Sequence, residues 1–392
     1  MRVALFAPYL PAPAHSGGRI RIQAFAKALG AIAEVSLFAS AGAEDIERHG
    51  GDAGFELYAS THFAKTARAW LSSAHVPARV RRCAPPALRS AFQRAHAERR
   101  FDVAVVEHAY AATVPMEVNA VPWVLDEHNV ESHYARERLS AAGPLNELMA
   151  RREVRALARW ERRVWGSASH VVCVSQSDAD EITLASGRRP SVIPNGALIS
   201  GTRFVPPSRR SGYEILFIGL MGHEPNAAAA RFLAKEVLPF LQRLEPRAKL
   251  VLCGADPTPA VRRLAGPSVE VTGRVASVQP YLERAAVYAN PLQHGAGTSL
   301  KVLEALASGI PLVSSASGVR GFALKQGEDY SAAESAQEFA ACLLRCLRGR
   351  GACDPAAERN RAFAEAHDFS VLGRRFAELV ANCAGAERRS VS

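Results

Sequence analysis

Short apolar runs alternate with longer stretches of helical periodicity along the whole chain. The apolar runs predict strands at residues 2–7, 34–39, 101–106, 121–125, 170–174, 213–218, 249–253, 268–271, 286–290 and 311–314. Apolar positions three and four residues apart predict helices at residues 19–29, 145–164, 226–243, 278–285, 299–308 and 334–348. Apolar strands that alternate with helices are typical of parallel sheets covered on both faces.

The alternation restarts after a polar stretch at residues 204–212, whose sequence FVPPSRRSG has the composition of a linker. We therefore expect an N-terminal domain of residues 1–204 and a C-terminal domain of residues 205–392. A helix near residues 365–385 is expected to pack back onto the first domain. Both are expected to be doubly wound α/β domains that face each other across a cleft. Because such sheets bind ligands beyond the carboxyl ends of their strands, candidate chemistry is sought in the loops that follow strands.

The composition is that of a globular protein, since 48% of the 392 residues are hydrophobic and 22% are charged. No stretch approaches the roughly 20 consecutive apolar residues that a membrane-spanning helix needs. The first residues are broken early by Pro8 and do not have the pattern of a signal peptide. We therefore expect a cytoplasmic protein.

The formal net charge of +10 favours an anionic partner. Three kinds are consistent with this charge: nucleic acid, an anionic membrane surface and a phosphorylated small molecule. Nucleic-acid-binding proteins usually carry a dense basic run, whereas here the arginines are spread over predicted helices near residues 78–100 and 151–163. This distribution disfavours nucleic acid and leaves open a peripheral contact with the inner face of a membrane.

Metal and cofactor motifs are the next class to consider. The seven cysteines are scattered, and Cys342 and Cys346, four residues apart in a predicted helix, lack the two further ligands that zinc requires. No predicted strand is followed by G-x-G-x-x-G or by G-x-x-x-x-G-K-[ST], which disfavours a dinucleotide site and a P-loop. We expect neither a metal nor a bound cofactor.

Loops after strands of the first half carry candidate polar chemistry. Gly17 and Gly18 precede a predicted helix, where backbone N–H groups and the helix dipole favour an anion, although a turn that needs glycine is the alternative. The polar segment 126–132 follows an apolar strand, and within it His128 is a candidate for hydrogen bonding or acid–base chemistry. His108 follows another strand and is expected at the same edge of the sheet. A solvated loop and a structural histidine are the alternatives for these two features.

The most specific pattern is residues 290–311, NPLQHGAGTSLKVLEALASGIP. It predicts a strand end, a glycine-rich loop and a helix that begins near Ser299, so that small residues and free N–H groups are available to phosphate. Lys301 adds a cation in the first turn, and Glu304 offers a carboxylate to the two hydroxyls of a ribose. Together these features describe a pocket for a nucleoside diphosphate. A tight turn beside a charged helix face is the alternative.

These residues resemble the retaining glycosyltransferases of the family 4 type, the glycosyl transferases group 1, whose GT-B fold has two Rossmann-like domains. In the second half the resemblance is carried by G-x-x-G-x-x-P-N from Gly219, T-G-R-V at 272–275, the segment 291–311 and G-V-R-G at 318–321. In the first half it is carried by Gly17–Gly18, the segment 126–132, V-S-Q-S at 174–177 and I-P-N-G at 193–196.

The resemblance implies an enzyme that moves a sugar from a nucleotide diphosphate to a glycan, lipid-linked or small-molecule acceptor, with retention and without metal. The implied catalytic residues are His128, near the reacting sugar, with Lys301 and Glu304. The implied donor-binding residues are Gly17, Gly18, Gly219, Gly222, Gly273, Arg274, Val275, Gly297, Thr298, Ser299, Leu300, Lys301 and Glu304. Residues expected on the acceptor side are His108, Asp126, Glu127 and Asn129.

Two positions depart from the family pattern. Family members often carry a glutamate eight residues before the ribose glutamate, where this chain has Ala296. They also often carry an arginine and a lysine after the first strand of the second domain, where residues 219–224 contain neither. Compensation of the diphosphate charge then falls on Lys301, on backbone N–H groups, or on Arg274 or Arg320. Alternatives on the same fold are a nucleotide-sugar epimerase and a catalytically silent nucleotide-sugar-binding subunit.

Overall fold

The computed structural model describes residues 1–13, 16–61, 76–83, 85–137, 144–293 and 299–390, which form two compact units. The first unit comprises Met1–Asn195 together with Phe369–Ser392, and the second comprises Gly196–Asp368. The division after Asn195 differs from the predicted boundary at residue 205. Among the described helices, none combines the length and the hydrophobicity that crossing a bilayer requires.

Within the described residues, the first unit contains a parallel sheet of seven strands in the order β3-β2-β1-β4-β5-β6-β7. The strands are β1 (Arg2–Ala7), β2 (Glu34–Ala41), β3 (Glu56–Thr61), β4 (Val103–Glu107), β5 (Trp123–Glu127), β6 (His170–Cys173) and β7 (Ser191–Val192). The helices are α1 (Gly17–Gly30), α2 (Ala43–His49), α4 (Ala78–Cys83), α5 (Pro86–Arg99), α6 (Thr113–Val118), α7 (Glu131–Glu137), α8 (Pro144–Ser167), α9 (Gln176–Ser186) and α17 (Phe369–Ser390).

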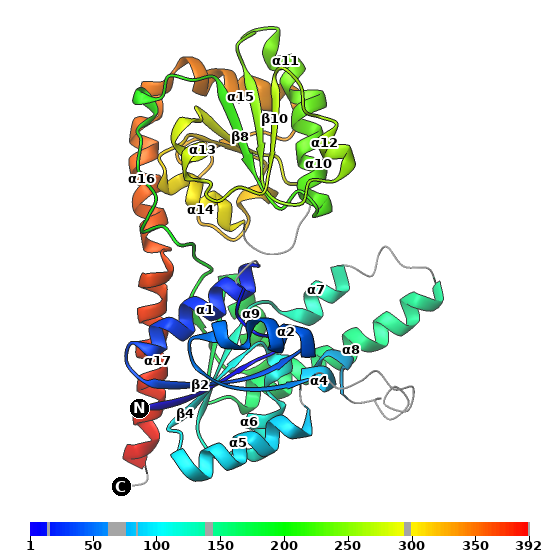
Figure 1. Ribbon diagram of the computed structural model, residues 1–392, viewed down its shortest axis with the longest axis vertical. Helices are drawn as coiled ribbons and strands as arrows, with labels where there is room; N and C mark the ends of the chain where they lie inside the picture. The colour runs from blue at the N-terminus through cyan, green and yellow to red at the C-terminus, as the bar shows by residue number, and fades with distance from the viewer. Residues whose placement is uncertain (14–15, 62–75, 84, 138–143, 294–298, 391–392) are drawn as a thin grey trace. The chain divides into compact units, whose positions relative to one another are not determined.

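Different helices cover the two faces of this sheet (Figure 1). On one face α1 and α17 lie side by side, with α1 on β1 and α17 on β4 and β5, and the ring of Phe25 stacks on that of Phe376 with centroids 4.5 Å apart. On the other face Phe92 of α5 meets Phe6 of β1 edge to face at 5.1 Å, and Trp160 of α8 joins the same cluster. Each such aromatic side chain contributes roughly 1.5–3 kcal/mol through its burial. The end of the chain is thus part of the core of the first unit.

The described part of the second unit contains a parallel sheet of six strands in the order β10-β9-β8-β11-β12-β13. The strands are β8 (Glu214–Ile218), β9 (Lys249–Cys253), β10 (Val269–Gly273), β11 (Val287–Asn290), β12 (Leu312–Ser314) and β13 (Ser331–Ala332). The helices are α10 (Glu224–Phe232), the π-helical turn η5 (Leu233–Val237), α11 (Leu238–Gln242), α12 (Pro259–Arg262), α13 (Gln279–Arg284), α14 (Leu300–Ala307), α15 (Ala336–Arg348) and α16 (Asp354–Ala366).

Both sheets reverse their strand order at one point, which fixes where ligands bind. In the first unit β1 lies between β2 and β4, and in the second β8 lies between β9 and β11. The connections leave such a point in opposite directions, so the loops diverge and open a crevice beyond the carboxyl ends of the two strands. The loops after β1 and β4, and those after β8 and β11, are therefore the positions for a site in each unit.

The stretch 204–212, predicted to be a linker, is packed into the second unit. Arg210 is 4% exposed, and its guanidinium donates to the carbonyl oxygens of Leu282 and Ser308, each at 2.7 Å. Gly309, with φ +76°, leaves the space that the ring of Phe204 occupies, since a Cβ there would lie 2.6 Å from it. The prolines and charges of this stretch therefore belong to an ordered connection. The side chain of Arg210 links three loops of the second unit.

We predict that Arg210→Ala lowers the free energy of unfolding of the second unit by about 3 kcal/mol, because it leaves buried carbonyl groups without donors. Thermal unfolding followed by circular dichroism should show the loss. All four tryptophans precede residue 195, so the fluorescence transition of the first unit should move much less. The neighbouring Arg209 is exposed, and Arg209→Ala is the matched control. Equal effects of the two substitutions would contradict the anchoring role.

Candidate functional site

The crevice of the first unit is formed around the start of α1. Gly17 and Gly18 make its first turn, and the N-cap Ser16 provides no side-chain hydrogen bond to that turn. A Cβ on Gly18 would lie 2.6 Å from the hydroxyl of Tyr9, which follows β1, and 3.5 Å from Nδ1 of His128, which follows β5. A side chain at position 18 would therefore displace the Tyr9 hydroxyl, and the structure places Gly18 next to His128.

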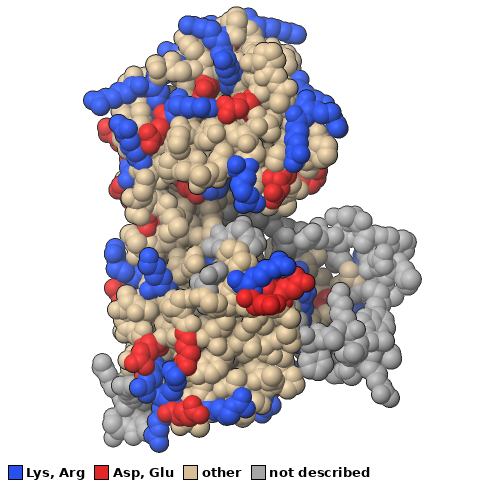
Figure 2. Space-filling model, in the orientation of Figure 1, with Lys and Arg blue, Asp and Glu red and all other residues tan. Residues whose placement is uncertain are grey.

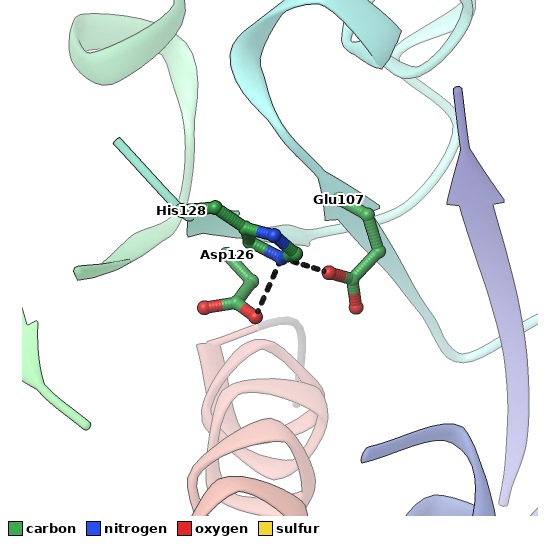
Figure 3. Close-up of side chains that lie close together, drawn as sticks. All are labelled: Glu107, Asp126 and His128. Atoms are coloured by element: carbon green, nitrogen blue, oxygen red, sulfur yellow. Dashed lines mark hydrogen bonds and ion pairs between the residues drawn. The ribbon is translucent and has the colours of Figure 1, made fainter. Parts of the chain in front are cut away.

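Two buried acids, Glu107 and Asp126, contact the ring of His128 (Figure 3). Its Nε2 donates to Oε2 of Glu107 at 2.7 Å and lies 3.4 Å from Oδ2 of Asp126. Arg21 of α1 donates to both oxygens of Asp126, at 2.8 and 2.7 Å, and neither side chain of this pair is exposed. Glu107 and Asp126 face each other because β4 and β5 are paired in parallel with these two residues in register.

The charges of this cluster influence one another strongly. Burial and the carboxylate of Asp126 raise the pKa of Glu107 to about 7, against the opposing effect of His128. Burial favours neutral His128, but its hydrogen bonds to Asp126 and Glu107 outweigh burial and raise the pKa of the ring. Burial likewise acts against ionised Asp126, yet Arg21 holds the pKa of that carboxyl well below its ordinary value. Asp126 is thus the fixed anion, and Glu107 and His128 share a proton.

His108 lies next to this cluster, and its backbone has a strained conformation. Its φ of 68° and ψ of 142° fall in a region that side chains other than glycine rarely adopt, at a cost of roughly 1–3 kcal/mol. The ring lies 3.9 Å from that of His128 and stacks on Tyr110, and its Nε2 is 3.3 Å from the hydroxyl of Tyr9. Burial and nearby His128 lower the pKa of His108 well below its ordinary value, so the ring is neutral. Among the described residues, no group hydrogen-bonds its buried Nδ1.

Asp126 and Glu127 do not face an acceptor, contrary to the expectation from the sequence. Successive residues of a strand point to opposite faces, so Asp126 points to Arg21 and Glu127 to α8. Glu127 is 1% exposed and accepts hydrogen bonds from the indole of Trp165 at 3.1 Å and from the backbone of Ala109 at 3.3 Å. Asn129 is half-buried, and its amide lies 3.4 Å from Oε1 of Glu131.

A further buried acid, Glu161, binds the free backbone N–H groups at the start of α7. Glu161 of α8 accepts hydrogen bonds from the backbone N–H groups of Glu131, at 2.6 Å, and Ser132, at 3.2 Å. Burial raises the pKa of Glu161 to about 7 in spite of these bonds. Burial and nearby Glu161 also raise the pKa of Glu127 well above its ordinary value. The polar segment 126–132 is therefore held by acids beneath it rather than solvated.

In the second unit, the glycines after β8 serve packing between loops. A Cβ on Gly219 would lie 2.9 Å from the side chain of Asn226, and one on Gly222 would lie 3.0 Å from the carbonyl oxygen of Asp256. The side chain of Asn226 donates to the carbonyl oxygen of Leu220 at 3.0 Å. These contacts fill the space beside both Cα atoms. Packing between loops therefore accounts for glycine at both positions, and no ligand is needed to explain it.

In the turn after β10, by contrast, the glycine does not pack against a described neighbouring loop. Gly273 has φ +68°, and no atom lies within 4 Å of the position of a Cβ. Arg274 is exposed and lies 3.5 Å from Asp256, whereas Val275 packs against the core. Within the described residues, the space beside Gly273 is thus unfilled, and the contact of this turn with a base stays a prediction.

The segment after β11 begins the helix where the sequence predicted it. Ser299 is the N-cap of α14, and its side chain makes no capping hydrogen bond. Leu300 and Lys301 form the first turn, and Lys301 Nζ lies 2.8 Å from Oε1 of Glu304, which is 17% exposed. Gly297 and Thr298 lie outside the described residues. The cation and the carboxylate of the predicted diphosphate and ribose sites therefore lie side by side and neutralise each other.

Glu107, Asp126 and His128 place their potential metal-ligand atoms within 4.8 Å of one another. The arrangement does not fit a cation. His128 directs a proton at Glu107, and both oxygens of Asp126 already accept from Arg21, whose permanent charge would repel the ion. The cluster is better described as a proton-sharing network.

Arg21 and Tyr9 were not predicted as site residues. Arg21 lies within the apolar stripe of α1, beside Ile22 and Phe25, and such a charge on a buried face signals a buried partner. Tyr9 follows the first strand within a proline-rich loop, and nothing in its spacing distinguishes it. Partners 105 and 99 residues away, Asp126 and His108, show that these contacts are decided by the fold.

We predict that the first unit loses stability as the pH rises from 5 to 8. The pKa of Glu161 is raised from 4.5 to about 7, so the folded state binds its proton more tightly than the unfolded chain, and stability is lost as that proton leaves. Glu161→Gln keeps an acceptor and should remove up to about 3 kcal/mol of this dependence. Urea unfolding followed by tryptophan fluorescence measures it, with the exposed Glu98→Gln as control. An unchanged slope would contradict the assignment.

Comparisons with known proteins agree with this architecture. Residues 16–196 match the glycosyl transferase 4-like domain, and residues 212–349 match the glycosyl transferases group 1 family. Together the matches span both units. No curated protein matches the chain by sequence.

Solved structures share the fold over nearly the whole chain. Sucrose-phosphate synthase from Thermosynechococcus elongatus has a TM-score of 0.67 at 16% identity, with 98% of this chain and 100% of that chain covered. HepE (Alr3699) from Anabaena, in complex with UDP, has a TM-score of 0.69 at 16% identity, with 97% and 100% covered. WaaG, a glycosyltransferase involved in lipopolysaccharide biosynthesis, has a TM-score of 0.64 at 18% identity, with 96% and 99% covered.

These structures have the two Rossmann-like domains of the GT-B fold, which is the fold expected from the sequence. The family matches carry the assignment further, because they cover both domains in the order in which they occur here. The chain therefore belongs to the group 1 glycosyltransferases and is an enzyme that transfers a sugar.

Proposed function

We propose that the enzyme takes a sugar from a nucleotide diphosphate and transfers it, with retention and without a metal, to a glycan, lipid-linked or small-molecule acceptor. The observation that carries this proposal is the start of α14. There an uncapped helix end beyond β11 lies next to Lys301, and Glu304 follows one turn later. Structures of the related fold in HepE with UDP and with UDP-glucose support a nucleotide-sugar donor.

In this proposal the second unit binds the nucleotide. Glu304 accepts hydrogen bonds from the ribose hydroxyls, and the N–H groups of Gly297, Thr298, Ser299 and Leu300 receive the diphosphate. Lys301 exchanges Glu304 for phosphate oxygens when the donor binds, since both partners are anionic. The open turn at Gly273–Val275 meets the base. Gly219 and Gly222 contribute by shaping the loop after β8.

The first unit acts on the sugar and the acceptor. The start of α1 at Gly17 and Gly18 and the ring of His128 approach the transferred sugar and its phosphate. His108 and Asn129 face the acceptor, while Asp126 and Glu127 hold this surface from within. Tyr9 joins the acceptor side because its hydroxyl lies between His108 and Gly18.

The chemistry needs electrostatic help more than a strong protein base. Breaking the anomeric bond produces an oxocarbenium-like centre and an anionic leaving group, which helix ends and cations stabilise. In a front-face reaction the departing phosphate accepts the proton of the attacking hydroxyl, and the new bond forms on the face that the leaving group vacates. Retention follows, and no acid pair is required.

Contact with an anionic membrane is the second part of the proposal. The exposed face of α8 carries Arg152, Arg155, Arg159, Arg162 and Arg163. In the described residues none of these five lies in an ion pair, whereas on the face drawn in Figure 2 cationic side chains are scattered among acidic ones. An unpaired row of arginines attracts anionic headgroups by about 1 kcal/mol per residue. We propose that α8 rests on the inner face of a membrane that holds a lipid-linked acceptor.

We predict that Lys301→Ala lowers kcat more than tenfold and that Glu304→Gln raises the Kd for the nucleotide about tenfold, with the fold intact. Lys325 and Glu328 form a second lysine–glutamate pair three residues apart in the same unit, so Lys325→Ala and Glu328→Gln are matched controls. Transfer assays and thermal shifts with conjugates of UDP, GDP, ADP and dTDP measure these effects and identify the base. Equal effects in both pairs, or no transfer from any donor, would contradict the proposal.

We predict that replacing Arg155, Arg159 and Arg162 of α8 with glutamine weakens sedimentation with vesicles containing phosphatidylglycerol by at least about tenfold. Transfer to a soluble acceptor should be unchanged. The control replaces the exposed arginines 262, 263 and 359 of the second unit with glutamine. Binding that survives the α8 substitutions would show that another surface meets the membrane.

A further inference from the structure

The ring of His128 is held on one side and open on the other. Its side chain is 5% exposed, and Nε2 is directed at Glu107 and Asp126 (Figure 3). The opposite nitrogen, Nδ1, lies 3.5 Å from the position of a Cβ on Gly18 and makes no hydrogen bond within the described residues. The ring is therefore fixed with one nitrogen aimed at the first turn of α1.

That turn offers further donors. α1 is 14 residues long, and the side chain of its N-cap Ser16 leaves the first N–H groups uncapped. The hydroxyl of Tyr9 reaches the same place, because it lies 2.6 Å from the Cβ position on Gly18. The first turn of α1, the hydroxyl of Tyr9 and Nδ1 of His128 thus lie next to one another around Gly18, and N–H, hydroxyl and imidazole groups are of the kinds that bind a phosphoryl group.

The charge of the His128 ring decides how strongly such a group is held. In the second unit Lys301 is paired with Glu304 at 2.8 Å, and Arg274 lies 3.5 Å from Asp256. Neutral imidazole would present a lone pair to phosphate at Nδ1, because its proton is on Nε2. Protonated imidazole presents N–H instead, together with a full positive charge.

Glu107 and Asp126 are the two acids next to this charge, and they differ in their other partners. Both oxygens of Asp126 are occupied by Arg21, so the two charges largely cancel. Glu107 has no such cation, its Oε2 accepts from His128 at 2.7 Å, and its buried Oε1 has no hydrogen-bond partner among the described residues. Among the described residues, His128 is thus the group that hydrogen-bonds the Glu107 carboxylate.

Resting on the function proposed above, we propose that Glu107 is a positioning residue for sugar transfer, which fixes the His128 ring and keeps it protonated so that Nδ1–H donates to a phosphoryl group of the substrate at the start of α1. The phosphoryl group belongs to the diphosphate of the donor or to a phosphate of the acceptor.

The other charged and titratable groups that surround His128 do not replace Glu107 in this role. Burial keeps His108 neutral, and burial raises the pKa of Tyr9, so its hydroxyl keeps its proton. Glu131 is paired with Arg79 at 2.7 Å. Arg19 of α1 donates to the carbonyl oxygen of Leu10 at 2.7 Å. Among the described residues, the charged and titratable groups that act on the ring or on its neighbours include Arg19, Arg21, Arg79, Glu107, Asp126, Glu131, His108 and Tyr9.

The protonation of His128 is measured directly by NMR titration of the full chain labelled with 13C at histidine Cε1, with the signal assigned from its loss in His128→Gln. Glu107→Gln should lower the titration midpoint of His128 by at least about one pH unit. Glu161→Gln, also a buried glutamate of this unit, is the matched control and should leave the midpoint in place. Glu107→Asp, which keeps the charge, should restore part of the shift. An equal midpoint in wild type and Glu107→Gln would overturn the proposal.

The consequence for catalysis is measured by the pH profile of kcat. Glu107→Gln should shift the alkaline limb to lower pH by the same amount as the His128 midpoint, so that kcat falls about tenfold at pH 8 and recovers toward the wild-type value at pH 6. A residue with a merely structural role would lower kcat equally at all pH values, and that result would overturn the positioning role. Thermal unfolding of each variant confirms that it is folded.

The source of the phosphoryl group is distinguished by two probes. If the donor supplies it, adding UDP should raise the His128 midpoint while inorganic phosphate has little effect. If the acceptor supplies it, inorganic phosphate should raise the midpoint while UDP does not. A midpoint that neither probe moves would overturn the phosphoryl site. A chain that transfers no sugar but shows the Glu107-dependent midpoint would contradict the proposed function while supporting the control of His128 by Glu107.

Discussion

The buried ion pair between Arg21 and Asp126 is the constraint on which the first unit depends. It joins α1 to the end of β5, and the same guanidinium donates to the carbonyl oxygens of Ile193 and Pro194, each at 3.0 Å. Removing one partner of such a pair usually costs about 3–5 kcal/mol, because the other charge stays buried. One side chain thus links α1, the end of β5 and residues 193–195 at the end of the first segment of this unit.

The chemistry of the site is built on this fixed pair. With Asp126 committed to Arg21, the acid left beside His128 is Glu107, and a proton is shared between the two. The strained backbone of His108 places its neutral ring in contact with the ring of His128. A network of this kind is costly to bury, so its presence at the point where the strand order reverses agrees with a functional rather than a structural origin.

Much of the fold was predictable because hydrophobic periodicity is a local property. The central strands were predicted within two residues, since strands buried on both faces are apolar throughout. The strands β3, β7 and β13 were missed: they lie at sheet edges, where short length or partial exposure removes the apolar signal. The stretch 204–212 was misread as a linker, because composition does not reveal that Arg210 finds buried carbonyl groups more than 70 residues away.

The sequence by itself determined the class of the fold, the start of α14, the presence of Lys301 and Glu304 in its first turns and the placement of His128 and Gly18 in segments that follow strands. These follow from spacing along one helix or from the rule that parallel strands end at a common edge. The tertiary structure alone decided that Asp126 and Glu127 face inward in opposite directions, that Gly219 and Gly222 serve loop packing and that Glu107 holds His128. The reason is physical: the direction of a side chain at a strand end, and the charge it meets there, depend on residues 21 to 105 positions away that only folding brings into contact.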